Sequence, residues 1–474
     1  MHYSPGAPVL KSYNLVNWDY VGHSVPELSF GAKYNLEGGS SAYVAGIWAS
    51  SLRYRKSDGQ YYWLGCIDFA QTHIFRAPEA TGPWSKIATL PRCYYDAGLL
   101  FDDDDDSVYV AYGSTNIEVA QLSRDCTSQI RSQVVHRADI YIEGSRMYKI
   151  NGSYYIFVTR APDAEFVLKA GSPFGPYQIR NLVDRIGSPV PDTGAPHQGG
   201  IVDTPDGDWY YASFIDAYPL GRIPVLAPIS WSGDGWPTLQ KVNNAWGKEY
   251  EVPIGTDWFP SPPRVTYNFS SPTLPPQWEW NHNPDSSKWS ILRDGGLRLE
   301  TATATNDLYS ARNTLTHRIR GPRSQGTFHI NIARMTDGDR AGAVMLRDRS
   351  AYIGVWKEGA EARIVMVDGM TMDSNWKTNS TGKVAARGPV LSGGDVWLRI
   401  VADVTPAFNS GRARSATFWY STEGLEGSYR QLGPAFSLHN SWRFFMAYRY
   451  GVFNHATKVL GGSVSVRSFT MDQL

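Results

Sequence analysis

A turn followed by an aromatic strand recurs four times in the first half of the chain. The units read SDGQYYWLG around Gly59, DDDDDSVYVAYG around Asp104, KINGSYYIFVT around Gly152 and TPDGDWYYASF around Gly207, at spacings of 45, 48 and 55 residues. Asp-Gly and Asn-Gly pairs flanked by alternating apolar residues are strong hairpin signals. A period near fifty residues that contains only strands predicts a β-propeller with one blade per repeat.

A second marker repeats in step with the hairpins. Outer strands end at Trp84 and at Tyr177, each 25 residues after a hairpin glycine. Equivalent outer segments occur at residues 9–18, 119–125 and 225–236. Five outer strands therefore accompany only four hairpins, and the same offset from Trp18 puts the fifth hairpin before Met1. We expect a five-bladed propeller whose first blade is truncated at its N-terminal side, the alternative being an irregular first blade.

The composition and the residue pattern of the sequence change after residue 250. Seven prolines fall between Pro253 and Pro276, which is typical of a linker. Alternating apolar and polar runs such as GTFHINIAR, AYIGVW and DVWLRIVAD follow without a blade period, which predicts a β-sandwich. The predicted all-β chain thus has a propeller at residues 1–252, a Pro-rich linker at 253–276 and a jelly-roll or concanavalin-like sandwich at 277–474.

Composition excludes several partners and chemistries. The 45 basic and 45 acidic residues cancel, which argues against a nucleic-acid or anionic-membrane surface. Cys66, Cys93 and Cys126 show no metal-ligand spacing and allow at most one disulfide. No phosphate-binding loop, dinucleotide fingerprint or metalloprotease motif occurs. Aromatic residues make up 13% of the chain, and flat rings that stack on ligands are one use for such a content.

Four polar or aromatic residues are predicted to converge on the propeller axis. The innermost strand of a blade precedes its hairpin, so residues at a fixed distance before the hairpins face the central channel. Asp96, Glu143, His197 and Trp48 lie 8, 9, 10 and 11 residues before their respective hairpin tips. We expect these four residues to form a functional pocket; for Trp48, a place in the core is the alternative.

Two carboxylates in different environments suit the cleavage of a glycosidic bond, because one protonates the leaving oxygen while the other stays ionised. Trp48 and Tyr95 offer rings on which a sugar can stack, and Arg222 can donate several hydrogen bonds to hydroxyl groups. A structural ion pair is the alternative for Arg222. The run Asp102–Asp106 falls at a hairpin tip, where its expected role is to solvate the turn, away from the axis.

The segments YVAGIWAS, YYDAGLLFDDD, EGSRMYKINGSYYIF, PHQGGIVDTPDGDWYY and YPLGRIPVLAPISW together resemble glycoside hydrolase family 43. The second domain resembles the companion sandwich of that family's xylosidase and arabinofuranosidase branch through PPQWEWNHNPD, ARNTLTHR and RDRSAYIGVW. The resemblance implies an inverting five-bladed enzyme with Glu143 as general acid. It makes Asp96 the residue that tunes the pKa of this acid and orients it. The implied pocket-lining residues are Trp48, Tyr95, His197 and Arg222.

The resemblance also implies a substrate and a setting. The closest similarity is to fungal secreted α-L-arabinofuranosidases that remove arabinose from arabinoxylan, with a β-1,4-xylosidase as the alternative within the family. We therefore expect a secreted monomer that binds arabinoxylan or xylo-oligosaccharides and neither nucleic acid nor a membrane. No cofactor is expected to be required, and a structural Ca²⁺ near His197 is an option that the family allows.

The general base is the exception to this match. In the family, this aspartate lies on the first inner strand, upstream of an SPG turn, whereas MHYSPGAPVLKS begins just after that region. Asp19 follows an outer strand and Glu27 lies in a loop, so the general base is expected to be absent from the chain. A carbohydrate-binding protein with weak turnover is therefore the alternative from another functional class. A purely structural propeller, with its axis filled by side chains, is a third.

Overall fold

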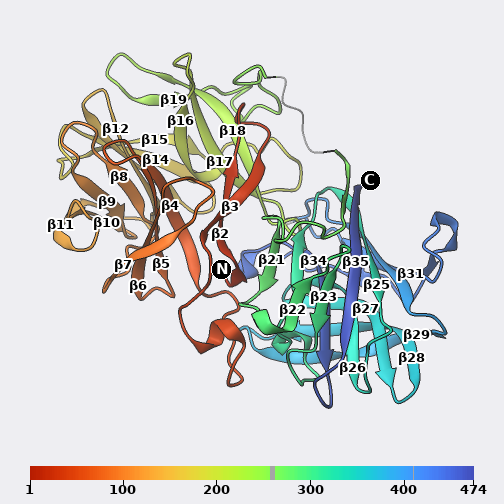
Figure 1. Ribbon diagram of the computed structural model, residues 1–474. Coiled ribbons are helices and arrows are strands. Elements are labelled where there is room, and N and C mark those ends of the chain that lie inside the picture. Colours follow the sequence, from red (N-terminus) through yellow and green to blue (C-terminus); the bar gives the residue numbers. More distant parts are fainter. Residues whose placement is uncertain (257–261, 409) are drawn as a thin grey trace.

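The computed structural model describes residues 1–256, 262–408 and 410–474, and it confirms the predicted all-β class. Figure 1 shows two strand-rich bodies, a propeller-like arrangement formed by the first half of the chain and a sandwich formed by the second. The helical turns are short: η1 (Ala32–Asn35), η2 (Ser286–Lys288), η3 (Leu308–Ser310), η4 (Glu426–Ser428) and η5 (Trp442–Phe444). No helix in the described part of the chain has the length and apolar character needed to span a membrane.

Four antiparallel sheets of four consecutive strands each form the propeller-like arrangement. The first sheet contains β4 (Ile47–Arg55), β5 (Gln60–Ile67), β6 (Gln71–Ala77) and β7 (Ser85–Leu90). The second contains β8 (Gly98–Phe101), β9 (Val108–Tyr112), β10 (Asn116–Leu122) and β11 (Gln129–Arg137). The third contains β12 (Glu143–Ile150), β13 (Ser153–Arg160), β14 (Ala164–Ala170) and β15 (Gln178–Asp184). The fourth contains β16 (His197–Asp203), β17 (Trp209–Asp216), β18 (Arg222–Trp231) and β19 (Pro237–Leu239).

The predicted hairpins form where the turn chemistry places them. At the tip between β12 and β13, Asn151 has φ 49° and Gly152 has φ 75°, the two positive values that a tight hairpin turn needs. Neighbouring blades bury aromatic and aliphatic side chains between them. One such layer packs Tyr109 and Ile117 of the second sheet against Met147 and Ile156 of the third.

A smaller sheet precedes these four blades. β2 (Gly6–Lys11) and β3 (Asp19–Val25) form an antiparallel pair with no further strand in the described part of the chain. Val9 and Val25 bury their side chains in one cluster with Trp63 and Phe75 of the adjacent four-stranded sheet. Four blades are thus present as complete sheets, whereas the prediction of five blades with a truncated first one stays a prediction.

The second half of the chain folds into two large sheets. The eight-stranded sheet runs in the order β1 (Tyr3–Ser4), β21 (Trp278–Asn281), β24 (Leu315–Arg318), β34 (Arg449–Ala456), β26 (Asp339–Leu346), β27 (Arg349–Glu358), β28 (Glu361–Met372), β29 (Thr378–Val390). The main path of the nine-stranded sheet is β22 (Trp289–Ile291), β23 (Leu297–Glu300), β35 (Ser463–Gln473), β25 (Arg323–Asn331), β30 (Asp395–Asp403), β31 (Ser415–Ser421), β32 (Arg430–Gln431). Off this path, β20 (Arg264–Tyr267) pairs with β35, and β33 (Phe436–Ser437) pairs with β31.

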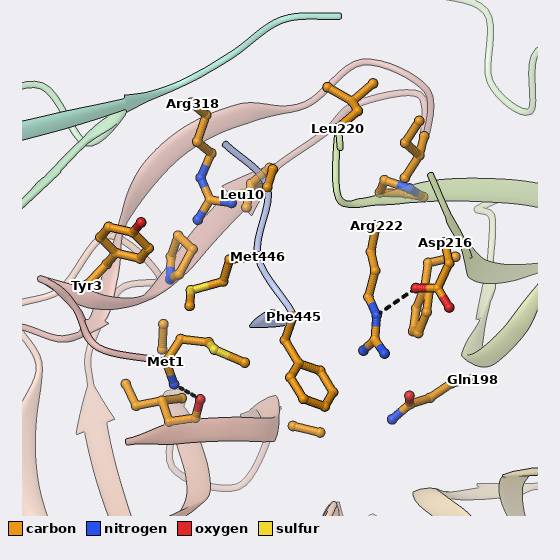
Figure 2. A pocket seen from close by; sticks show the side chains of 18 of the residues that line it. Met1, Tyr3, Leu10, Gln198, Asp216, Leu220, Arg222, Arg318, Phe445 and Met446 are labelled. Carbon is orange, nitrogen blue, oxygen red and sulfur yellow. Dashed lines mark hydrogen bonds and ion pairs between the residues drawn. The ribbon is translucent and has the colours of Figure 1, made fainter. Parts of the chain in front are cut away.

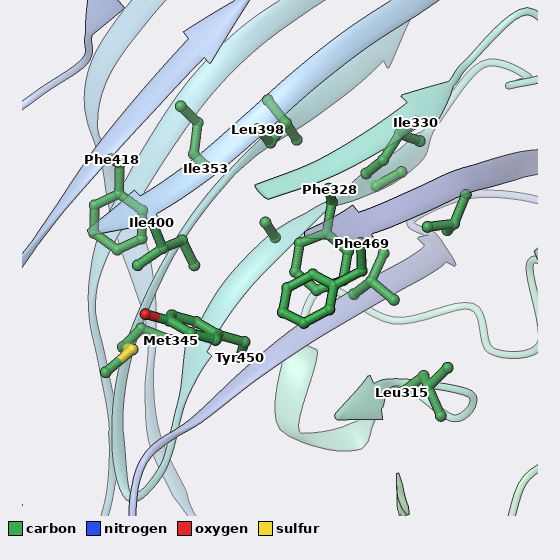
Figure 3. Packing of buried hydrophobic residues seen from close by; sticks show 14 of the residues in the cluster. Leu315, Phe328, Ile330, Met345, Ile353, Leu398, Ile400, Phe418, Tyr450 and Phe469 are labelled. Atoms are coloured by element: carbon green, nitrogen blue, oxygen red, sulfur yellow. The ribbon is translucent and has the colours of Figure 1, made fainter. Parts of the chain in front are cut away.

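The inward faces of these two sheets form the largest core. Figure 3 shows Phe328, Leu398 and Phe469 of the nine-stranded sheet facing the space that Met345 and Tyr450 of the eight-stranded sheet also fill. All five side chains are buried. Along the nine-stranded sheet, core positions alternate with partly exposed ones such as His329 and Ser468. On the eight-stranded sheet, both neighbours of Met345, namely Val344 and Leu346, are buried in a second cluster.

The two bodies share backbone and side-chain contacts. β1, from the start of the chain, pairs with β21 of the sandwich, with Tyr3 opposite Asn281. The backbone N–H of Ala42 donates to Nε2 of His282 at 2.9 Å. Within the predicted linker 253–276, Arg264–Tyr267 forms strand β20, and residues 257–261 lie outside the described part of the chain.

The run Asp102–Asp106 does more than solvate its turn. Asp102 is only 2% exposed; it accepts hydrogen bonds from Nζ of Lys149 at 2.6 Å and from the hydroxyl of Tyr154 at 2.5 Å. Asp106 pairs with Arg55 of β4 at 2.5 Å. The hairpin tip therefore ties its own blade to the blades on both sides, which corrects the expectation drawn from the sequence.

Candidate active site

A cavity of about 1960 Å³ lies between the propeller axis and the sandwich. It is lined by all six predicted site residues, namely Trp48, Tyr95, Asp96, Glu143, His197 and Arg222. The axis is therefore open, which removes the support for a structural propeller filled by side chains. Figure 2 shows Arg222, Gln198 and Phe445 pointing into one space from three different elements.

β-bulges at the start of three inner strands point the site residues toward the axis. The strand register shifts between Ile47 and Ser50 in β4, which brackets Trp48. It shifts again directly after Glu143 in β12 and directly after His197 in β16. A bulge bends its strand and changes the direction of a side chain, and such features often occur next to active sites.

Asp96 is held in an unusual backbone conformation just before β8. Its φ is 49°, and its side chain is only 6% exposed. Two residues on, a side chain at Gly98 would meet the backbone of Arg146 and Met147 at 2.8 and 2.7 Å, so only glycine lets β8 and β12 approach this closely. This approach brings Asp96 next to Glu143. Burial, and then the charge of Glu143, raise the pKa of Asp96 to about 7.

Two phenol groups hold the carboxylate of Glu143. The hydroxyl of Tyr95 donates to Oε2 at 2.6 Å, and the hydroxyl of Tyr141 donates to the same oxygen at 3.0 Å. Tyr141 was not predicted, although it lies two residues before Glu143 and thus on the same side of an extended segment. The other oxygen, Oε1, receives no hydrogen bond from the described residues and can carry a proton.

Arg222 combines both roles that were considered for it. Its Nε lies 3.2 Å from Oδ1 of Asp216, which forms an ion pair across neighbouring strands β17 and β18. Its guanidinium also lies over the rings of Phe214 and Phe445, at 4.4 and 5.4 Å from their centres. The side chain is 32% exposed and borders the cavity, so its remaining N–H groups can reach a ligand.

The sandwich contributes an aromatic wall to the cavity. Phe445 follows η5 in a left-handed conformation, with φ 60°, and its ring meets that of Trp48 edge-on at 5.1 Å. The ring of Phe69 also lies near that of Trp48, with the two ring centres 4.7 Å apart. Trp48 is therefore a half-buried cavity residue, and the core alternative does not apply. No sequence pattern near Phe445 or Phe69 indicated this contact.

His197 is 1% exposed, and its Nδ1 lies 2.9 Å from the carbonyl of Ala195. Burial lowers the pKa of His197, so the ring is neutral and Nδ1 carries the proton that it donates to this carbonyl. Ca²⁺ prefers six to eight oxygen ligands. The described residues contain no group of three or more His, Cys, Asp or Glu side chains that could hold a metal ion. A Ca²⁺ near His197 would therefore depend on backbone carbonyl, amide or water oxygens, and it stays a prediction.

The acidic residues around the cavity differ in how they are engaged. Asp19, at the start of β3, lines it together with Asp96, Glu143, Asp216 and Glu279. Glu279 forms ion pairs with Arg449 at 2.5 Å and Arg318 at 3.2 Å. Burial raises the pKa of Glu279, but the two guanidinium groups outweigh it and hold this pKa well below its usual range. Glu279 and Asp216 are thus both committed to arginine, and the assignment of no base to this chain stays a prediction.

Comparison with protein families gives a match along nearly the whole chain. The model of "Glycosyl hydrolases family 43" matches residues 1–237. The model of the "Beta xylosidase C-terminal Concanavalin A-like domain" matches residues 266–472. The two matches fall on the propeller and on the sandwich.

Individual relatives have more specific activities than the family name gives. A β-xylosidase from Formosa agariphila is 27% identical, and the match covers 99% of this chain and 85% of the relative. A non-reducing-end α-L-arabinofuranosidase from Bacteroides ovatus is 25% identical, with 77% and 72% covered. A solved structure described as an engineered GH43 glycoside hydrolase with both endo-xylanase and exo-arabinofuranosidase activity is 51% identical. It has a TM-score of 0.97, and the match covers 100% of this chain and 94% of that one.

Proposed function

Because the chain belongs to glycoside hydrolase family 43, we propose that it is an inverting, exo-acting enzyme that removes α-L-arabinofuranosyl side chains from arabinoxylan. One observation carries the proposal: Glu143, held by Tyr95 and Tyr141, shares with Asp96 a cavity that Phe445 of the sandwich walls off. The 51% identical structure linked to exo-arabinofuranosidase activity supports arabinose as the sugar, because the β-xylosidase relative is only 27% identical.

The geometry suits Glu143 as the general acid. With Oε2 held by two hydroxyl groups, Oε1 is the atom that would carry the proton and pass it to the leaving oxygen. Burial, and then the charge of nearby Glu143, raise the pKa of Asp96 to about 7. The N–H of Gly144, which follows the acid, contributes a hydrogen bond to Asp96 and fixes their relative position.

We assign the two-stranded sheet β2–β3 to the outer half of a fifth blade. This assignment rests on the contrast between two strands here and four in each other blade. Without a base to activate water, turnover is expected to be about 10²- to 10⁴-fold lower than with one. A carbohydrate-binding protein with weak turnover is the second candidate function.

A β-1,4-xylosidase is the alternative within the family. It is favoured by the Formosa agariphila β-xylosidase, whose match covers 99% of this chain. Cleavage of 4-nitrophenyl α-L-arabinofuranoside should exceed cleavage of 4-nitrophenyl β-D-xylopyranoside if the sugar is arabinose. The reverse order would replace the arabinofuranosidase proposal with the xylosidase.

The central test compares Glu143→Ala with Glu27→Ala, which removes an exposed acid from a loop. Hydrolysis of the aryl arabinofuranoside should be lost in the first variant and unchanged in the second. Calorimetry with arabinoxylan oligosaccharides should show binding in both. Hydrolysis that survives Glu143→Ala would refute the role of this residue, and binding by the wild-type chain without any sugar release would support the binding protein.

We also propose that the protein is a secreted monomer. The disulfide between Cys66 and Cys93 supports this setting, because disulfides persist in oxidising compartments. Cys126 is buried and unpaired. Sedimentation at several protein concentrations would test the monomer.

A further inference from the structure

A second cavity lies on the sandwich and shares no lining residue with the candidate active site. It has a volume of about 210 Å³. Its polar lining residues are Arg298, Asn331, Arg334, Ser463, Ser465 and Arg467. No acidic residue lines it, although the chain as a whole carries no net charge. The positive charge is therefore concentrated at this cavity, because the chain as a whole is not basic.

The strand register builds this cavity from three neighbouring strands. Arg298 of β23 lies opposite Ser465 of β35, and Ser465 lies opposite Asn331 of β25. All three are partly exposed, whereas Leu297, Val466 and Ile330 of the adjacent row are buried in the sandwich core.

A β-bulge brings a second arginine to the same place. The pairing of β25 with β35 skips Arg467, because His329 pairs with Ser468 and Ile330 pairs with Val466. Arg467 is the extra residue of this bulge and is exposed. Arg334 comes from the turn after β25, and its carbonyl accepts a hydrogen bond from the N–H of Ser463 at 3.0 Å.

The guanidinium groups around the cavity are incompletely paired. Arg298 contacts Glu300 through Nη2 at 3.3 Å, but its Nε is buried and has no hydrogen-bond partner among the described residues. The structure shows no ion pair for Arg334 or Arg467 within the described ranges. A buried donor without a partner costs free energy, so a ligand that accepts from Arg298 would stabilise the site.

We propose that this cavity binds the carboxylate of an acidic monosaccharide unit, such as a uronic acid carried on a glycan. Planar guanidinium groups match the two oxygens of a carboxylate, while Ser465 and Asn331 can bond to sugar hydroxyls. With about 30 Å³ per water molecule in the liquid, the cavity has room for one small ligand and is too small for a long oligosaccharide. The proposal rests on the proposed function only for the view that the natural ligand is a plant-type glycan.

An aromatic pair continues the surface along the sheet. His329 and Trp397 stack with ring centres 4.0 Å apart and planes inclined by 13°. His329 and Trp397 lie two residues before Asn331 on β25 and two residues after Asp395 on β30. Side chains two residues apart point to the same face of a strand, and the residues between them, Ile330 and Val396, are buried. The ring of Trp397 beside a cationic cavity suits a sugar ring with a carboxylate, while His329 pairs with Asp395 at 2.9 Å and so places one acidic group near this surface.

The test is calorimetry on the full chain with three probes: D-glucuronate, D-glucose and inorganic phosphate. Glucuronate should bind with an affinity that falls as sodium chloride is raised, and glucose should not bind. Arg298→Gln should weaken glucuronate binding by roughly 10- to 100-fold, since it removes hydrogen bonds to a charged group. Arg430→Gln, which changes an exposed arginine at the opposite edge of the same sheet, is the matched control and should bind as the wild type does.

Arg467→Gln provides a second variant in case Arg298→Gln fails to fold, because Arg467 is exposed. It should also weaken glucuronate binding. Equal binding of glucuronate by the wild type and Arg467→Gln would overturn the proposal, as would binding of phosphate without binding of glucuronate. Cleavage of the aryl arabinofuranoside should be unchanged in both arginine variants, so failure of this site and failure of the proposed function give different results.

Discussion

Asp102 and Asp103 are adjacent members of a run of five aspartates, and replacing each with asparagine should have very different effects on stability. Asp102 is 2% exposed and accepts from Lys149 at 2.6 Å and from Tyr154 at 2.5 Å. Among the described residues, Asp103 pairs with Lys56 alone, at 2.5 Å, and their side chains are 55% and 74% exposed. The two residues thus present the same chemistry in two different environments.

The expected magnitudes follow from these contacts. Each hydrogen bond to a charged group contributes about 1.5–3 kcal/mol, and breaking a buried ion pair costs about 3–5 kcal/mol. Lys149 keeps a second partner, Asp104, at 2.6 Å, which reduces the loss. Asp102→Asn should therefore lower the free energy of unfolding by about 2–4 kcal/mol. Asp103→Asn should lower it by at most about 1 kcal/mol, because exposed ion pairs contribute little.

Thermal and urea unfolding followed by tryptophan fluorescence would measure both variants. A loss of this size should lower the melting temperature of the propeller by roughly 2–4 °C per kcal/mol. Equal shifts for the two variants would refute the assignment of Asp102 as a buried link between blades.

The pH dependence gives an independent check on Asp102. Burial by itself raises the pKa of this carboxyl, but the bonds from Lys149 and Tyr154 lower it below its usual value overall. A carboxyl whose folded-state pKa is lowered stabilises the fold above its unfolded pKa, near 3.9, and loses this contribution as pH falls through the folded value. The difference between wild type and Asp102→Asn should thus be constant near pH 7 and shrink below about pH 4.

Three further outcomes are expected. Phe445→Ala should raise KM for the aryl arabinofuranoside by roughly 10-fold in steady-state assays, because it removes an aromatic wall, and an unchanged KM would contradict its place in the site. Asp96→Asn should stabilise the protein above pH 7 by up to about 4 kcal/mol in urea unfolding, because a pKa raised from 3.8 to about 7 disfavours the charged form in the fold; the gain should vanish near pH 4. The double change Cys66→Ser and Cys93→Ser should cost about 3.5 kcal/mol, from a sequence separation of 27 residues, and a melting temperature equal to that of the wild type would argue against the disulfide.

The spacing of the hairpins along the sequence was enough to predict most of the propeller and the residues at its axis. The hairpin period predicted sheets of consecutive strands, and the structure has four of them. The offset before each hairpin selected Trp48, Asp96, Glu143 and His197, and the structure brings all four to one cavity. This worked because a repeated blade places equivalent positions at equivalent sites. The catalytic roles of these residues stay predictions.

Features that depend on distant partners could not be predicted in this way. Strand β1 has two residues, and its partner β21 lies in the other half of the chain, so no local pattern indicates it. Phe445 reaches the cavity from a loop of the sandwich, again without a local signal. Residues of the same type can also lie in different environments, as Asp102 and Asp103 do. Their burial depends on the neighbouring blade, which the local sequence does not show. Tyr141 is different: it was not predicted, although its position two residues before Glu143 is a local signal that could have indicated it.

The position of Phe445 has a consequence for how such a protein can evolve. The acid comes from the propeller and one wall of its cavity comes from the sandwich, so neither domain carries the whole site. A recombination event that exchanged only the sandwich would replace this wall while leaving Glu143 and Asp96 in place. Substrate preference could then change in a single inherited step without any substitution among the carboxylates, and selection would act on the two domains as one unit.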